Sequence, residues 1–339
     1  MKKTSLLILF ALLVSFNRAT AQGLFRISQD QASKKVDVLI DGKLFTSLLY
    51  ADSLKKHVLY PVKTTEGATV TRGWPIEPQK GDQIDHPHQI GVWFNYGDVN
   101  GADYWNNSTK IDTNKKPYGT IKVRLVKNIK AGKGRAEFTV AASWLNPGGL
   151  PVLEETTRYI FREEQGLRLI SRETLLKALQ GVSLKDNKEG LFAIRVSRQL
   201  EAKSDKPVAV YLDKNNIKKI IDPDITTGVY ESSRGVKGEE VFGTRSEWLK
   251  LTGTVDAKPV AVVLMDHPSN INYPGFWMAR GYGLFAINPL GAEFYTGGKE
   301  RLNFSLEKGK RLSFKHQLVI GSKLDSSRIN KLHQAFAKE

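Results

Sequence analysis

The amino-acid sequence predicts an all-β protein, a large antiparallel β-sandwich that ends in a C-terminal helix. Apolar and polar residues alternate with period two over most of the chain after Gln22, as they do in half-buried strands. Tight-turn dipeptides and clusters of Gly or Pro separate these runs, and helical spacing occurs only near the end of the chain. Because no Pro- or Ser-rich linker divides them, residues 22–339 are expected to form a single domain of two packed sheets.

The first predicted element is a β-hairpin. Strand-like residues 35–40 and 43–50 flank Asp41-Gly42, a dipeptide that adopts the positive φ angles of a type I′ turn at little cost.

A meander of antiparallel strands is predicted over residues 119–175. Turn sequences occur at 131–134, 146–149 and 164–166. Between the turns, residues at every second position are expected on one face of successive strands: Ile121, Val123 and Leu125; Ala136, Phe138, Val140, Ala142 and Trp144; Thr157, Tyr159 and Phe161; Leu167 and Leu169.

Four more strands and one helix complete the predicted fold. The strand-like runs are 207–212, 260–265, 284–287 and 311–320, each bounded by Gly, Pro or Asp. Ile329, Leu332 and Phe336 recur with helical spacing and predict an amphipathic helix at the end of the chain.

The first 21 residues have the pattern of a secretory signal peptide. Lys2 and Lys3 precede an apolar run at 6–16, and Ala19-Thr20-Ala21 fits a small-x-small cleavage site. The run is shorter than the ~20 residues that a membrane-spanning helix needs. We expect cleavage after Ala21, no lipid anchor because no cysteine follows, and a mature protein in the periplasm or outside the cell.

The net charge of +16 is unevenly distributed along the chain. Cleavage would lower it to +13, and residues 106–135 carry +8 of this, with nine Lys or Arg and one acid, Asp112. The alternation of Lys122 and Arg124 with apolar residues favours a strand with a basic solvent face over a groove wall for an anionic polymer. Because aromatic residues are not interleaved with these charges, we expect no nucleic acid partner, and no membrane partner after signal cleavage.

The composition also excludes several kinds of site. Without cysteine the chain has no disulfide, thiol nucleophile, cysteine-ligated zinc or iron–sulfur cluster. It has no Gly-x-Ser-x-Gly elbow, phosphate loop, dinucleotide fingerprint or His-Glu-x-x-His helix.

Polar and aromatic side chains gather in two segments, 85–105 and 266–289, and Asp-His-Pro opens both. In an extended strand His86 and His88 would share one face, a spacing that suits proton transfer at one substrate atom or, with His267 or Asp266 as a third ligand, a divalent metal. We expect no cofactor, but the sequence does not exclude a divalent metal bound by these histidines. The alternative is structural: Asp85 and Asp266 accept backbone hydrogen bonds in turns before proline.

Arginines and ring-bearing residues complete the predicted site. Arg72, Arg195 and Arg245 are expected either to pair with buried acids such as Glu155 or Glu189, or to bind an anionic or carbonyl group of a ligand. Arg280 is a further candidate to stabilise negative charge on a substrate. Aromatic rings beside amides and acids are typical of sugar-binding sites, although for any single tryptophan a place in the core is the stronger expectation. The residues expected to bind substrate are Trp93, Asp98, Asn100, Asp103, Trp105, Glu189, Glu247, Trp277 and Asn288.

Ordered motifs over about residues 45–322 resemble a bacterial family labelled "methane oxygenase PmoA". They include Val70-Thr71-Arg72-Gly73, the whole of 85–105, and the segments 243–248 and 282–289. The resemblance implies a secreted β-sandwich protein of carbohydrate-utilising bacteria, similar in fold to the mutarotase-type supersandwich. Gln89-Ile90 stands where that family usually has His and Arg, and Met278 stands where it often has His. These differences weaken the prediction of a metal centre that uses those positions.

We predict a carbohydrate-acting enzyme in which His86 or His88 moves a proton and an arginine stabilises developing negative charge. Epimerisation or β-elimination of a keto-sugar or uronate suits these residues. Glycoside hydrolysis usually needs two carboxylates, for which the candidates are Asp85, Asp98, Glu247 and Asp266. The alternatives are a glycan-binding protein without turnover, and a metal-dependent oxygenase as the family label suggests.

Overall fold

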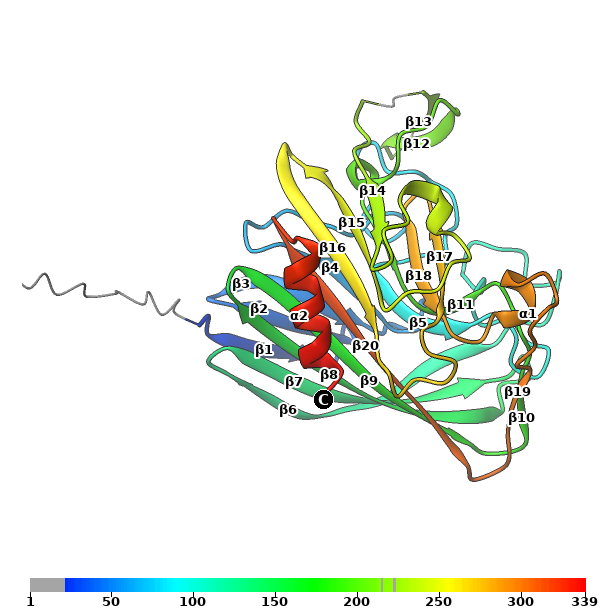
Figure 1. The fold of residues 1–339 in the computed structure, drawn as a ribbon. Helices are drawn as coiled ribbons and strands as arrows, with labels where there is room; N and C mark the ends of the chain where they lie inside the picture. Colours follow the sequence, from blue (N-terminus) through cyan, green and yellow to red (C-terminus); the bar gives the residue numbers. More distant parts are fainter. Residues whose placement is uncertain (1–21, 215, 222–223) are drawn as a thin grey trace, which may run out of the picture.

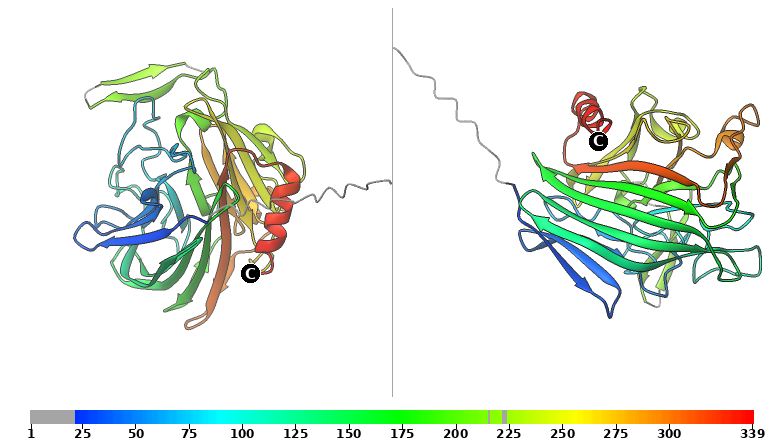
Figure 2. Two further views of the ribbon diagram at one scale, coloured as in Figure 1. Left: turned by 90° about the vertical axis from the view of Figure 1, so that its left-hand side faces the viewer. Right: turned by 90° about the horizontal axis from the view of Figure 1, so that it is seen from below.

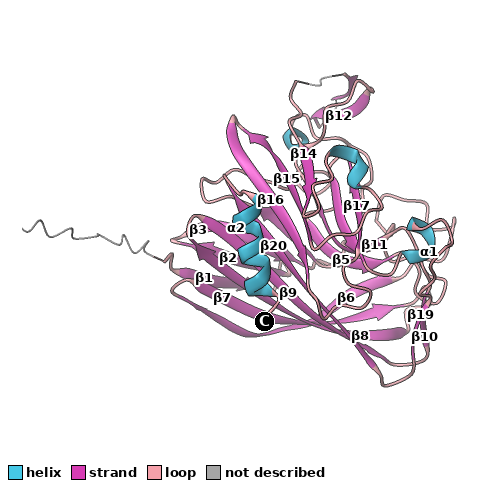
Figure 3. Cartoon of the chain, in the orientation of Figure 1, coloured by secondary structure: helices cyan, strands magenta, loops and turns pink. Residues whose placement is uncertain are grey.

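Two eight-stranded antiparallel sheets form most of the protein, which confirms the predicted all-β sandwich with its C-terminal helix (Figures 1 and 3). The computed structural model describes residues 22–214, 216–221 and 224–339, so the predicted signal peptide lies outside the described residues. No helix in the described part of the chain is long and apolar enough to cross a membrane.

The first sheet has the strand order β1-β2-β3-β4-β5-β11-β18-β17. Its strands are β1 Phe25–Asp30, β2 Lys35–Ile40, β3 Lys43–Leu49, β4 Val58–Val62, β5 Val92–Tyr96, β11 Gly190–Arg195, β17 Phe276–Arg280 and β18 Leu284–Asn288.

The second sheet has the strand order β14-β15-β16-β20-β9-β8-β7-β6. Its strands are β6 Thr120–Gly132, β7 Arg135–Leu145, β8 Pro151–Glu164, β9 Leu167–Ala178, β14 Val229–Ser232, β15 Trp248–Val255, β16 Lys258–Asp266 and β20 Arg311–Gly321.

Two short strand pairs and four helical segments complete the described fold. The hairpin of β12 and β13 projects from the sandwich (Figure 2). The elements are β10 Val182–Leu184, β19 Phe304–Leu306, β12 Val208–Asp213, β13 Asn216–Ile220, the 3₁₀ turns η1 Arg198–Leu200 and η2 Gly238–Val241, and the helices α1 Ala292–Tyr295 and α2 Ser326–Phe336.

The predicted first hairpin is confirmed by β2 and β3. Asp41 and Gly42 connect them with φ angles of 49° and 77°, the left-handed conformation that a type I′ turn requires at both positions.

The predicted meander is also confirmed, because β6 to β9 pair in sequence order. Three of its side chains point elsewhere than expected. The pairing register shifts between Val123 and Leu125, so Leu125 is 53% exposed and Val126 is buried instead. Leu167 and Leu169 lie on the outer face of β9.

Three apolar layers follow from the alternation of side chains along the strands. The largest lies between the two sheets. On the outer face of the second sheet, Ile329 and Phe336 of α2 pack against β9, β15, β16 and β20. A third cluster lies on the outer face of the first sheet, around Trp93 and Met278. The candidate site is built on this third layer.

A charged network is buried between the sheets. The Glu155 carboxylate on β8 accepts hydrogen bonds from Trp144 Nε1 (2.8 Å), Thr157 Oγ1 (2.7 Å) and Arg172 Nη2 (2.6 Å). His57 Nε2 lies 3.4 Å from the same carboxylate. Burial lowers the pKa of His57 to about 4; Glu155 opposes this shift and Arg172 adds to it.

His57 should make stability depend on pH. Because the unfolded imidazole titrates near its ordinary pKa of ~6.5, acidification protonates the unfolded chain first and lowers the free energy of unfolding. Between about pH 7.5 and pH 5, the wild-type protein should lose roughly 2 kcal/mol more than His57→Gln does. Urea denaturation at both pH values measures this difference, and equal losses in the two proteins would contradict the assignment.

Candidate functional site

The candidate site lies on the outer face of the first sheet, where two strands present polar side chains. On β11, Phe192 and Ile194 enter the core between the sheets, so Arg195 points to the opposite face. On β17, Trp277 enters that core, while Arg280 is exposed on the outer side.

Two buried arginines hold Asp85 at this face. The side chains of Arg72 and Arg195 are completely buried, and both bind Asp85 Oδ1; the Arg195 Nη2 distance is 2.8 Å. Arg72 also donates to the backbone oxygens of His86 (3.1 Å) and Gln89 (3.0 Å), which fixes the loop that carries the histidines. Burial alone would raise the pKa of Asp85, but the hydrogen bond with His86 and the two arginine charges lower it below its usual range.

Asp85 in turn orients His86. His86 Nδ1 lies 2.6 Å from Asp85 Oδ2, and the imidazole stacks on the Tyr282 ring at a centroid distance of 4.9 Å and an interplanar angle of 6°. The His86 side chain is 40% exposed. Its backbone has φ of +41°, a conformation uncommon for residues other than glycine. The contacts of Arg72 and Tyr282 therefore maintain both the loop and the ring in one orientation.

His88 lies beside His86, but not because the segment is extended. The His86 backbone oxygen accepts from Gln89 N (3.0 Å), which closes a turn, and the two imidazole centroids are 5.7 Å apart. Burial lowers the pKa of His88 well below its ordinary value, and the nearby positive charges, Lys56 foremost, act in the same direction. His88 is therefore neutral at physiological pH.

A pocket of about 340 Å³ opens at the two histidines. The residues that line it come from both predicted segments and from the chain between them: His86, His88, Gln89, Asn106, Lys188, Glu189, Phe242, Met278, Arg280 and Tyr282. The segments 85–105 and 266–289 thus do meet at one pocket, the first through His86 and His88 and the second through Met278, Arg280 and Tyr282.

An adjoining pocket of about 640 Å³ shares Phe242, Arg280 and Tyr282 with the first. Glu201 lines this adjoining pocket, and the sequence did not predict it as a site residue. Gln83 Nε2 donates to Glu201 Oε2 (2.6 Å), and Arg198 forms an ion pair with the same oxygen. Burial raises the pKa of Glu201 to about 7, although the charges of Arg195 and Arg198 oppose this shift. The only sequence signal was the Arg-x-x-Glu spacing at 198–201, which is common in ordinary ion pairs.

Asp266 and His267 lie away from this pocket. Asp266 is fully buried and accepts hydrogen bonds from the backbone nitrogens of His267 (3.0 Å) and Gly275 (2.8 Å) and from Asn270 Nδ2 (2.6 Å). Asp266 thus has the structural role that the sequence offered as the alternative to a role in catalysis. His267 packs against Phe336 of α2.

Arg245 also has a structural role. Its guanidinium donates to the backbone oxygens of Pro274 (2.8 Å) and Asn272 (2.9 Å) and forms an ion pair with Glu300. The acid partners expected for the buried arginines also differ. Glu155 binds Arg172, and Glu189 pairs with Lys188.

Most residues expected to bind substrate instead form hydrogen bonds within the protein. Asp98 and Asp103 accept backbone hydrogen bonds within turns, from Gly101 N and Asn106 N, each at 2.9 Å. The other three connect segments that are distant in the sequence: Asn100 contacts Ser183, Glu247 contacts Ser233, and Asn288 contacts Asn187 and Lys188. Of the predicted substrate-binding residues, Glu189 lines the pocket.

The three tryptophans are core residues, as the sequence allowed. Trp93, Trp105 and Trp277 are at most 1% exposed, so other side chains cover their rings. Trp93 and Trp105 pack on each other at 5.3 Å, and Trp277 Nε1 donates to Ser246 Oγ (2.6 Å). The rings that reach the pocket are those of Phe242 and Tyr282.

The histidines named for a metal are divided between two places. His86 and His88 line the pocket, and His267 does not. Within residues 22–214, 216–221 and 224–339, His, Asp and Glu side chains form no group of three placed to hold a metal ion.

Several solved structures are similar to the chain. The GH36 alpha-galactosidase AgaB from Geobacillus stearothermophilus matches with a TM-score of 0.43 and 10% identity, over 88% of this chain and 41% of that one. AgaA from the same organism gives 0.40 and 11%, with the same coverage. The chain thus spans about two fifths of these galactosidases. A galactose mutarotase related enzyme from Lactobacillus acidophilus gives 0.27 and 11%, over 89% of this chain and 100% of that one.

No curated protein sequence matches the chain. A family model described as "Family of unknown function (DUF6807)" matches residues 35–334. This match corrects the assignment made from the ordered motifs: the methane-oxygenase-labelled family is wrong. The β-sandwich that the resemblance implied is confirmed by the two sheets themselves. Over nearly the whole described fold, the chain belongs to the DUF6807 family.

Proposed function

We propose that the protein acts on a keto-sugar or uronate by removing a proton from the carbon next to a carbonyl group, with His86 as the general base. The observation that carries this proposal is the Asp85–His86 pair at the pocket wall, held by the fully buried Arg72 and Arg195. With its expected signal peptide, the enzyme would work in the periplasm or outside the cell.

The hydrogen-bond geometry defines the role of each nitrogen of His86. Asp85 is ionised, so it accepts the Nδ1 proton and leaves Nε2 with a free lone pair as the base. When Nε2 takes a proton, the neighbouring carboxylate stabilises the imidazolium that forms. Tyr282 limits rotation of the ring by stacking on it.

Arg280 is suited to stabilise the enolate. Removal of the proton sends the electron pair of the C–H bond to the carbonyl oxygen, where negative charge develops. The Arg280 guanidinium lies 4.8 Å over the Phe242 ring, and in the described part of the chain no carboxylate forms an ion pair with it. It is therefore available to a substrate oxygen. Delivery of a proton from water to the other face, with release of the His86 proton to solvent, gives an epimer. Departure of a β-substituent with its bonding electron pair gives an unsaturated sugar.

The four carboxylates that the sequence offered for hydrolysis are each engaged in other contacts. Asp85 is engaged by two arginines and His86, and Asp266 is buried away from the pocket. Asp98 caps a turn, and Glu247 binds Ser233 and Arg234. No two of these four therefore flank one bond as a glycosidase requires. A glycan-binding protein without turnover predicts a cleft in which no histidine approaches an acid, unlike His86 here.

Proton exchange tests the step that epimerisation and elimination share. The purified mature chain is incubated in D₂O with a panel of keto-sugars and uronates, and deuterium next to the carbonyl is followed by NMR. We expect enzyme-dependent exchange, or an unsaturated product, with at least one member of the panel. Saturable sugar binding with neither outcome would contradict the proposal.

A further inference from the structure

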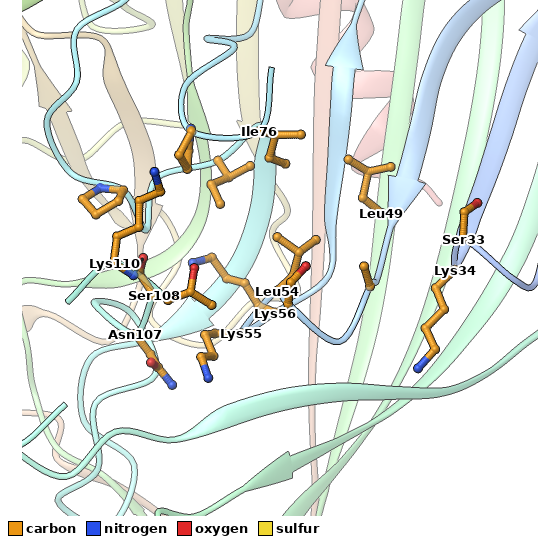
Figure 4. A pocket seen from close by; sticks show the side chains of 16 residues that line it. Ser33, Lys34, Leu49, Leu54, Lys55, Lys56, Ile76, Asn107, Ser108 and Lys110 are labelled. Carbon is orange, nitrogen blue, oxygen red and sulfur yellow. Dashed lines mark hydrogen bonds between the residues drawn. The ribbon is translucent and has the colours of Figure 1, made fainter. Parts of the chain in front are cut away.

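A third pocket lies behind the histidine loop. It has a volume of about 310 Å³, at the lower end of the range for small-molecule sites (Figure 4). Pro87 and Ile90 line it, whereas His88 and Gln89 of the same loop line the pocket of about 340 Å³ that contains His86. We call it the lysine pocket, after Lys34, Lys55, Lys56 and Lys110.

The charge of the lysine pocket is one-sided. No acidic residue of the described chain lines it. Lys34 is paired with Asp52 outside the lining. Lys110 instead lies 4.5 Å over the Trp74 ring, and no carboxylate in the described residues forms an ion pair with it or with Lys56.

Lys56 is the decisive side chain because it is almost completely buried, with 4% of its surface exposed. Its Nζ donates to the backbone oxygen of His88 (2.7 Å) and lies 5.6 Å from the Trp93 ring centroid. A buried ammonium without an ion-pair partner is costly, and an anion in the pocket would reduce that cost. Burial lowers the pKa of Lys56 to about 7, against the opposing charge of Asp103, so an anion bound there would favour the protonated amine.

The rest of the lining selects an anion with a hydrocarbon part. Leu49, Leu54, Pro75, Ile76, Pro87 and Ile90 form apolar walls, and Ser108 and Thr109 add hydroxyl groups. We propose that the lysine pocket binds a small amphipathic monocarboxylate, with its carboxylate at Lys56 and its hydrocarbon chain against Leu54, Ile76 and Ile90. This site is independent of the chemistry proposed for His86.

Calorimetric titration of the full mature chain tests the site with hexanoate as the probe. Hexanoate should bind saturably with a stoichiometry of one. Hexanamide lacks the charge and acetate lacks the hydrocarbon chain, so each should bind at least about tenfold more weakly than hexanoate. The proposal would be overturned if hexanamide or acetate bound as tightly as hexanoate, or if hexanoate showed no saturable binding.

Variants locate the bound probe. Lys56→Met should weaken hexanoate binding at least about tenfold. Lys110→Glu should also weaken it, and this variant disturbs no buried group. Lys331→Met, an exposed lysine on α2, is the matched control and should bind as the wild-type protein does. Unchanged affinity in both pocket variants, or loss of binding in His86→Gln, would place hexanoate elsewhere and contradict the proposal.

Discussion

Replacement of His86 by glutamine is expected to lower the exchange rate by roughly 10²- to 10⁴-fold, the usual contribution of a general base. Glutamine can still hydrogen-bond Asp85, but it cannot accept the substrate proton. The measurement is deuterium incorporation into whichever substrate the D₂O panel identifies, with circular dichroism to confirm that the variant is folded.

Two further variants separate proton transfer from a structural effect. His86→Gly suits the backbone φ of +41° and leaves space at the ring position, so added imidazole should restore part of the activity. His333→Gln changes a histidine on α2, against the second sheet, and should leave the rate unchanged. Full activity in His86→Gln, or a loss that imidazole does not reverse, would refute the assignment of His86 as the base.

Replacement of Glu155 by glutamine is expected to cost about 3–5 kcal/mol of unfolding free energy. The variant leaves the charge of Arg172 between the two sheets without its carboxylate, and the Arg172 side chain is only 1% exposed. The guanidinium also contacts the hydroxyls of Tyr159 and Thr174 and lies 4.0 Å from the Phe94 ring, but no second carboxylate of the described residues forms an ion pair with it. Urea denaturation followed by tryptophan fluorescence measures the loss.

The neighbouring glutamate provides the matched control. Glu154 points to the outer face of the same strand, where it is about a third exposed and pairs with Arg124 (3.5 Å) and Lys177 (3.7 Å). Glu154→Gln should change stability by less than about 0.5 kcal/mol, because solvent screens exposed ion pairs. Similar losses in the two variants would show that burial does not determine the contribution of Glu155.

Local patterns predicted the strands and turns well. The Asp41-Gly42 turn and the helix at Ile329 and Phe336 depend only on residues close in sequence, so their signals are complete in the sequence. The error at Leu125 came from a bulge, because one extra residue reverses every side chain that follows it in the strand. Leu169 was misplaced because α2 covers the outer face of β9, which gives that strand apolar residues on both faces.

The site was predicted only in part. The loop with Asp85, His86 and His88 stood out by composition, and so did Arg280. Asp266-His267-Pro268 has the same local sequence as Asp85-His86-Pro87, yet it supports the junction of β16 with α2. Glu201 and Lys56 had no distinguishing sequence context, because their properties arise from burial.

The sequence by itself determined the strand periodicity, the tight turns, the terminal helix and the residue types available for acid–base chemistry, since each depends on neighbours within a few positions. The tertiary structure decided which of two similar Asp-His-Pro segments lies at a pocket. It also decided that Arg72 and Arg195 converge on Asp85, and that Glu155 and Lys56 are buried. The physical reason is that desolvation and charge pairing depend on groups far apart in the chain, which only the packing of the two sheets brings together.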